Sequence, residues 1–135
     1  MALKITLKPH ERMILSGAVI ANGDTRCDLV VENNVPILRQ KDILSLKEAD
    51  TPCKRIYFAI QLMYVDEKNL SEHQRIFWEL VKDVLEAAPS TGILLNEICG
   101  HILQSEYYPA LKLTRKLITY ENEVMNHDRH ANAGL

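Results

Sequence analysis

Residues 3–44 read LKITLKPHERMILSGAVIANGDTRCDLVVENNVPILRQKDIL, and this stretch decides the fold of the chain. At its start, apolar Leu3, Ile5 and Leu7 alternate with polar residues. Alternation with a period of two is typical of a strand that buries one face, because successive side chains of a strand point to opposite sides. The stretch therefore begins with a half-buried strand.

The rest of this stretch predicts more short strands separated by turns. Residues 13–20 are apolar around Gly17, which marks a bulge or a turn. The sequence Asn22-Gly23-Asp24 predicts a tight turn, because Asn and Gly tolerate positive φ. Residues 27–32 and 36–39 read as two further strands. Strands this short do not form a stable flat sheet alone, so they must curl into a barrel, pack on helices or pair with another copy.

From residue 50 onward, apolar residues recur at helical spacing in four segments, residues 56–63, 76–85, 94–102 and 113–124. Short loops between helices favour an antiparallel bundle. We therefore predict an α+β protein. Residues 1–49 form a small antiparallel β-sheet or barrel, and residues 50–135 form a bundle of about four helices with a polar C-terminal tail.

Helix starts are marked in the sequence. Asp50-Thr51-Pro52 combines a capping side chain with a proline at the first helical position. Ser71 to Gln74 fits a capping box, Ser90 and Thr91 can cap a third helix, and Pro109 is predicted to open the fourth.

Composition and charge limit the functions open to the chain. Of its 135 residues, 47% are hydrophobic and 25% charged, the balance of an ordinary soluble globular protein. Residues 1–49 carry seven Lys or Arg and six Asp or Glu, and residues 50–135 carry nine and twelve. This distribution is not that of a protein that binds nucleic acid by charge alone. Any RNA binding must therefore be local and specific.

Cysteine spacing and hydropathy further limit the classes of protein to which the chain can belong. Cys27, Cys53 and Cys99 are scattered, and none forms a C-x-x-C pair, so we predict buried or half-buried thiols rather than disulfides or a zinc site. No segment approaches the roughly 18 consecutive apolar residues of a membrane span. The start, MALKITLKPHE, lacks the apolar core of a signal peptide. We expect a cytoplasmic protein with no membrane partner.

No constellation of residues predicts catalysis. The chain has no G-x-S-x-G, no phosphate-binding glycine loop and no H-E-x-x-H. His127 and His130 lie in a polar tail, where a metal site would need more ligands held in place. We interpret the acidic residues of the second predicted helix, Glu79, Asp83 and Glu86, as a solvent-exposed helix face rather than as paired catalytic acids. We predict no enzyme activity, no metal and no cofactor.

Positive residues suggest where RNA could bind. The N-terminal candidates for phosphate and base contacts are Lys4, Lys8, Arg12, Arg39 and Lys41. Arginine can pair bidentately with guanine edges, whereas lysine mainly neutralises phosphate. A second set, Lys112, Arg115 and Lys116, has the spacing of one helix face. For each set of positive residues, the alternative interpretation is an ordinary solvent-exposed face that does not bind RNA. Tyr107-Tyr108 is the better candidate for stacking on bases.

The order of short motifs along the chain resembles the FlbT family of flagellum biosynthesis repressors. The matching stretches are LKP-x-ER at 7–12, SGAVI-x-NGD at 16–24, PILR-x-KDIL at 36–44, ADTP-x-KRIY at 49–57, QLMY at 61–64, EL-x-KD at 79–83, AAPS at 87–90 and KLI-x-YE at 116–121. The resemblance implies binding to the 5′ untranslated region of flagellin mRNA. It also implies control of translation and message lifetime, usually as a repressor, although some members activate.

Residues 1–49 alone are also similar to the carbon storage regulator family, small β-proteins that form interleaved dimers on exposed GGA motifs. This resemblance implies a homodimer or higher homo-oligomer with residues 5–8 and 38–41 on the RNA-facing edge. There are departures. Leu7-Lys8 stands where that family has two arginines, and Arg39 matches its last-strand arginine only after a one-residue insertion.

A protein-interaction module is the competing class. In that reading, the acidic helical part holds flagellin or a flagellar secretion chaperone and acts on the message indirectly. A helix groove lined by Met63, Tyr64 and Trp78 would then be the binding site.

Overall fold

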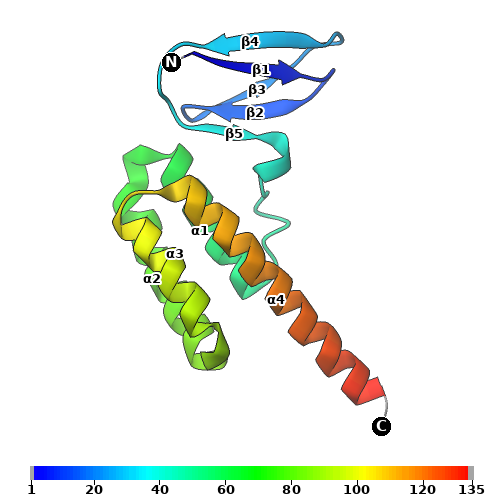
Figure 1. The fold of residues 1–135 in the computed structure, drawn as a ribbon, viewed down its shortest axis with the longest axis vertical. Helices are drawn as coiled ribbons and strands as arrows, with labels where there is room; N and C mark the ends of the chain where they lie inside the picture. Colours follow the sequence, from blue (N-terminus) through cyan, green and yellow to red (C-terminus); the bar gives the residue numbers. More distant parts are fainter. Residues whose placement is uncertain (1, 134–135) are drawn as a thin grey trace. The chain divides into compact units, whose positions relative to one another are not determined.

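A computed structural model describes the backbone of residues 2–133 and the side chains of residues 2–126 (Figure 1). The chain divides into two compact units. The first ends at Ile43 and also takes in Val65–Glu67, and the second comprises Leu44–Tyr64 and the chain from Lys68 on. The functional division between residues 49 and 50 stays a prediction.

The first unit contains five short strands, as the alternating pattern predicted. They are β1 (Leu3–Leu7), β2 (Arg12–Leu15), β3 (Ala18–Ala21), β4 (Cys27–Val31) and β5 (Ile37–Arg39). β1 pairs antiparallel with β4, and β2 lies between β3 and β5 in a three-stranded antiparallel sheet. A 3₁₀ turn, η1 (Gln40–Asp42), follows β5. The strands therefore form two small sheets rather than a closed barrel.

The core of the strand unit follows from the period of two. Ile5, Leu7 and Met13 are buried, while Lys4 is exposed and Thr6, between Ile5 and Leu7, is half-buried. Partly buried residues of the other strands, β2 to β5, pack against this cluster: Leu15, Ile20, Cys27, Leu29, Val31 and Ile37. Side chains of both sheets thus share one core, which explains how such short strands are stabilised.

Gly17 lies in a turn rather than a bulge. β2 and β3 pair as a hairpin with Leu15 opposite Ala18, which leaves Ser16 and Gly17 as the two loop residues. Both have positive φ, 50° and 87°, as a type I′ turn requires. A Cβ atom at Gly17 would also lie 2.9 Å from the carbonyl oxygen of Val65, so the position requires glycine on two grounds.

The segment Asn22-Gly23-Asp24 lies in the connection between β3 and β4, but Asn22 and Gly23 do not have the positive φ on which the turn prediction rested. Positive φ occurs elsewhere among the described residues, at His10, Ser16, Gly17 and Ser105. The Asn22 segment carries the chain from the three-stranded sheet to the two-stranded one. The Asn22 side chain acts through hydrogen bonds instead of through backbone freedom.

The second unit contains the four helices expected from the apolar spacing. They are α1 (Pro52–Val65), α2 (Leu70–Ala87), α3 (Gly92–Leu103) and α4 (Tyr107–Ala133), with 3₁₀ turns η2 (Glu67–Asn69) and η3 (Pro89–Thr91). Fully buried residues of all four form the helical core, among them Ile56, Ile60, Phe77, Ile98 and Leu117. The α+β class is confirmed. Within the described residues, no helix combines the length and hydropathy that crossing a bilayer requires.

The start of α1 is capped as predicted. The helix begins at Pro52, and the Thr51 hydroxyl accepts a hydrogen bond of 3.3 Å from the backbone N–H of Lys54. A further capping group comes from 70 residues away: the carboxylate of Glu121 on α4 accepts from the Thr51 hydroxyl and from the Cys53 N–H. Nothing in the local sequence indicated this second cap.

The other predicted helix starts need correction. α2 begins at Leu70, so Ser71 lies inside its first turn and the capping box is absent. The Thr91 hydroxyl donates backward to the carbonyl of Ala88 instead of capping α3. α4 begins at Tyr107 rather than Pro109. The proline is tolerated there because first-turn N–H groups have no partner within the helix.

Candidate nucleic-acid interface

The five positive residues predicted to contact RNA all lie in the first unit. Lys4 is on the outward face of β1, Lys8 follows that strand, Arg12 begins β2, Arg39 ends β5 and Lys41 lies in η1. Four of them are exposed, and Arg39 is partly buried.

Hydrogen bonds bring the segments of Lys8 and Arg39 together. The carboxylate of Glu11 accepts from the backbone N–H of Lys8 at 2.9 Å and lies 3.5 Å from Nη2 of Arg39. The Lys8 hydrogen bond, followed by the charge of Arg39, lowers the pKa of Glu11, so this carboxylate stays charged at neutral pH. Glu11 thus links the end of β1 to the end of β5.

Arg12 and Lys41 belong to the same region. The backbone N–H of Arg12 donates to Oε1 of Gln40, 2.6 Å away, which ties the start of β2 to η1. We call the segments around Lys8, Arg12, Arg39 and Lys41 the basic end of the strand unit. The sequence predicted these residues singly, and the structure brings their segments together.

Arg39 has a structural role that the sequence did not reveal. Its Nη2 donates to the carbonyl oxygen of Thr6 at 2.7 Å, which joins β5 to β1 across the two sheets. The side chain is still 40% exposed. Its guanidinium therefore holds the sheets together while keeping an open side.

Lys4 lies apart from the basic end. Its Nζ is 3.5 Å from Oδ2 of Asp28 on β4, and Thr6 donates to the other carboxylate oxygen at 2.7 Å. These contacts, the Thr6 bond first, lower the pKa of Asp28. The carboxylate partly neutralises Lys4, so this lysine contributes less positive potential than the sequence suggested.

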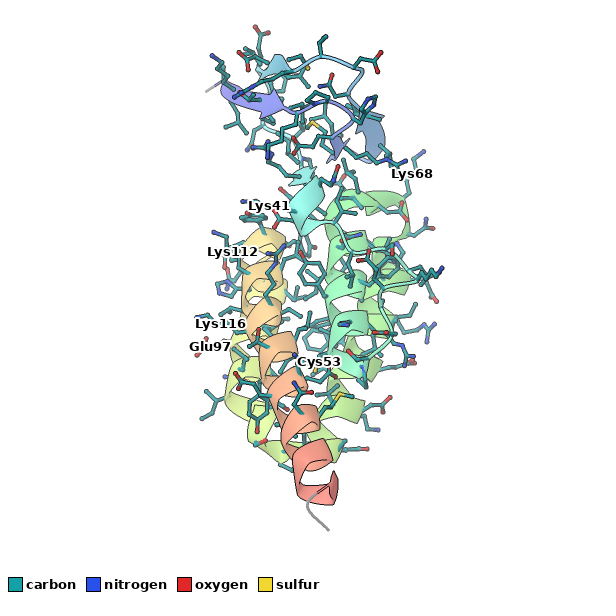
Figure 2. The ribbon with its side chains drawn as sticks, turned by 90° about the vertical axis from the view of Figure 1, so that its right-hand side faces the viewer. Lys41, Cys53, Lys68, Glu97, Lys112 and Lys116 are labelled. Atoms are coloured by element: carbon teal, nitrogen blue, oxygen red, sulfur yellow. The ribbon has the colours of Figure 1, made fainter. Side chains whose placement is uncertain are left out.

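The second positive set does not form one free face. Lys112 and Lys116 are exposed on α4 (Figure 2), and Lys112 Nζ lies 5.1 Å from the centre of the Tyr108 ring. Arg115 lies over the ring of Tyr57, 5.8 Å from its centre. The stacking candidates are engaged as well, because Tyr107 packs against Tyr64 at 6.4 Å.

The groove proposed for the competing class is not open. Met63 is fully buried, while Trp78 is 39% exposed and packs edge-on against Phe77. Met63 therefore belongs to the core and does not line a surface groove.

Histidines and acids do not gather into a metal cluster in the part of the chain whose side chains are described. His10 lies 3.3 Å from Asp24, and His101 lies 3.1 Å from Glu106, both as surface pairs. His127 and His130 fall outside the described side chains.

Comparison with known proteins gives one consistent result. Residues 3–125 match the family model described as "Flagellar protein FlbT". A relative from Bradyrhizobium diazoefficiens, "Probable flagellum biosynthesis repressor protein FlbT 1", is 46% identical over 92% of this chain and 85% of its own length. The "Flagellum biosynthesis repressor protein FlbT" of Caulobacter vibrioides is 39% identical over 94% and 92%. No solved structure matches significantly.

Proposed function

Because this chain belongs to the FlbT family of flagellum-biosynthesis regulators, we propose that it binds the 5′ untranslated region of flagellin mRNA. Binding there represses translation or promotes degradation of the message, in the cytoplasm where the message is translated. The observation that carries the proposal is the near-full-length match to relatives named as repressors of flagellum biosynthesis. Those names describe regulators rather than enzymes.

The basic end of the strand unit is the proposed contact surface. Lys8, Arg12 and Lys41 are exposed and can approach phosphates, and the open side of the Arg39 guanidinium can face a guanine edge. A message leader offers single-stranded or looped bases, which proteins reach more easily than bases in an RNA duplex. Glu11 offsets part of the positive charge of this surface, so the affinity for RNA should depend on salt only moderately.

Leader binding should weaken with salt, with a log–log slope of about −3 if four or five phosphates are neutralised. The combined change Lys8→Ala, Arg12→Ala and Lys41→Ala should make this slope shallower by about 2 and lower the affinity. Arg39 is left intact because its bond to Thr6 is structural. The measurement is a titration of fluorescent leader RNA with the purified full chain at several salt concentrations.

The matched control is Lys112→Ala with Lys116→Ala, which removes exposed lysines from the helical unit. If this control loses as much affinity for the leader RNA as the variant changed at Lys8, Arg12 and Lys41, the proposed surface is refuted. Equal affinity of the wild-type chain for the leader and a scrambled RNA would refute direct, specific binding.

We also propose that two or more copies join through their strands. The two-stranded sheet leaves one edge of β1 and one of β4 unpaired among the described residues. Leu3 on β1 and Val30 on β4 are 51% and 61% exposed, and Val19 on β3, at the edge of the other sheet, is 69% exposed. Open edges with apolar side chains pair readily with another chain.

A solution mass of at least twice that of one chain is therefore expected by sedimentation equilibrium. Val30→Lys should shift the population toward monomer, because an edge lysine disfavours pairing. Leu103→Lys, an equally drastic change at an exposed residue of α3, should not. A wild-type protein that is monomeric at all concentrations tested would rule out this assembly.

A further inference from the structure

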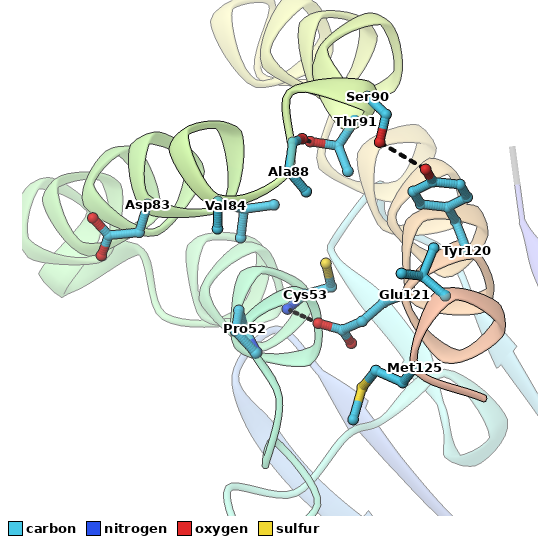
Figure 3. A pocket seen from close by; sticks show the side chains of 12 residues that line it. Pro52, Cys53, Asp83, Val84, Ala88, Ser90, Thr91, Tyr120, Glu121 and Met125 are labelled. Atoms are coloured by element: carbon cyan, nitrogen blue, oxygen red, sulfur yellow. Dashed lines mark hydrogen bonds between the residues drawn. The ribbon is translucent and has the colours of Figure 1, made fainter. Parts of the chain in front are cut away.

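A pocket of about 370 Å³ opens in the helical unit (Figure 3). Its walls come from the start of α1, the last turns of α2, the turn η3 and the second half of α4. Pro52, Val84, Ala87, Val124 and Met125 give it a predominantly apolar lining. This volume is within the range of small ligand and side-chain pockets.

The pocket continues the core face of α4. Leu117 is fully buried, and Val124 and Met125 follow it at seven and eight residues, on the same side of the helix. These two side chains are nevertheless 40% and 43% exposed. α4 runs on past the connection between α2 and α3, so the chain's own helices leave this part of its apolar face uncovered (Figure 1).

Among the side chains that the structure describes, the charged residues that line the pocket are acidic. Asp83 and Glu121 line it, and its lining includes no Lys, Arg or His. Glu86 lies one turn beyond Asp83, and Glu123 precedes Val124. The nearby Lys54 is engaged with Asp50 at 3.2 Å. An apolar pocket with acidic residues around its mouth favours a partner that presents an apolar surface flanked by positively charged residues.

We propose that this pocket docks an amphipathic helix of a partner protein, with apolar residues at i, i+3 or i+4 and i+7 and with Lys or Arg beside them. A helix laid in a groove supplies apolar side chains at that spacing. A second copy of this chain is a poor occupant, because a symmetric contact would bring Asp83 and Glu121 of both copies together. The site lies on the helical unit, and it does not depend on RNA binding.

The test uses a defined probe, an 18-residue fluorescein-labelled peptide with Leu at helical spacing on one face and Lys on both flanks. Two companion peptides carry the same residues in scrambled order, or Glu in place of Lys. Anisotropy titrations with the full chain should show binding of the first peptide only. Added salt should weaken this binding, because part of it is electrostatic.

Two variants locate the site. Val124→Ser combined with Met125→Gln should weaken peptide binding at least about tenfold, because two apolar contacts are lost. Leu103→Ser, at an apolar residue that is 74% exposed and outside the pocket, should leave binding unchanged. Asp83→Lys with Glu86→Lys should weaken the Lys peptide and strengthen the Glu peptide. Thermal unfolding of each variant separates lost binding from lost folding.

Three outcomes would overturn the proposal. One is equal binding by the wild type and the folded Val124 and Met125 variant. Another is equal affinity for the Lys and Glu peptides, which would remove the argument from charge. The third is a change from dimer to monomer on substitution of Val124 and Met125, which would make a second copy the occupant.

Discussion

Asn22→Ala should lower the free energy of unfolding by about 3 kcal/mol, the largest effect we expect from an exchange of a partly buried polar side chain in the strand unit. Nδ2 of Asn22 lies within hydrogen-bond distance of three carbonyl oxygens: Leu7 at 3.2 Å, Lys8 at 2.8 Å and Thr25 at 3.0 Å. Its Oδ1 accepts from the N–H of Gly23 at 2.8 Å and from the thiol of Cys27 at 3.3 Å. One side chain thus joins the end of β1 to the segment that leads into β4.

The size of the effect follows from the number of partners lost. A neutral hydrogen bond contributes about 1 kcal/mol net, and a partly buried acceptor left without a partner costs more. The two hydrogens of Nδ2 are shared among three carbonyls, so the sum is smaller than that of three full bonds. β1 and β4 are held as a two-stranded ribbon, so losing this link weakens their pairing directly.

Asn22→Asp is a more stringent test of the hydrogen bonds that Nδ2 of Asn22 donates. It keeps the shape of the side chain but places a carboxylate oxygen against three carbonyl oxygens, so it should destabilise at least as much as alanine. Asn34→Ala, in an exposed loop of the same unit, is the matched control and should change stability by less than about 0.5 kcal/mol. Urea unfolding followed by circular dichroism gives these values. Wild-type stability in both Asn22 variants would refute the role of this side chain.

Glu121→Ala should destabilise the protein by about 2–3 kcal/mol, by removing the cap that α4 provides to α1. One carboxylate oxygen of Glu121 accepts from the Thr51 hydroxyl. The other accepts from the backbone N–H of Cys53 at 3.1 Å (Figure 3). Hydrogen bonds to a charged group contribute more than neutral ones, and a negative charge at a helix N-terminus is favourable. The same contacts fasten the two helices to each other.

Glu121→Gln tests how much of this effect is due to charge. The amide oxygen can replace one carboxylate acceptor, so we expect about half of the loss seen with alanine. Glu123→Ala, two residues further along α4 and exposed, is the control and should be near neutral. Thermal and urea unfolding measure all three variants. A Glu121→Ala protein as stable as the Glu123→Ala protein would contradict the capping role.

The thiol of Cys53 beside this cap should stay unreactive. Burial, with a smaller contribution from Glu121, raises the pKa of Cys53 to about 12. The thiolate is the reactive form, so almost none is present at neutral pH. This agrees with the interpretation of the cysteine as a buried thiol.

Local patterns in the sequence predicted a large part of the fold. The alternation of Leu3, Ile5 and Leu7 predicted β1 and the burial of Ile5 and Leu7, although Leu3 is 51% exposed. The helical spacing of apolar residues predicted four helices. The start of α1 at Pro52 was predicted by its capping residues. These features succeed because side-chain direction repeats within a few residues, so a short window contains the signal.

Errors arose where a residue's role depends on distant parts of the chain. Asn22 looked like a turn former, but its function is to bond carbonyls of residues 14 and 15 positions earlier. The local sequence likewise gave no sign that Arg39 is bonded to Thr6, 33 residues away. A side chain that can form several different hydrogen bonds forms those whose partners the folded chain places beside it. The local sequence does not specify which partners these are.

The sequence by itself determined the fold class, most element boundaries to within a few residues and membership of the FlbT family, although α4 runs on to Ala133 through the predicted polar tail. Only the tertiary structure decided that β1 pairs with β4, that Glu121 caps α1, and that the face of α4 at Val124 is left uncovered. The reason is physical. Periodicity and turn chemistry are properties of neighbouring residues. Strand pairing, capping between helices and the exposure of an apolar helix face depend instead on which distant segments meet when the chain folds.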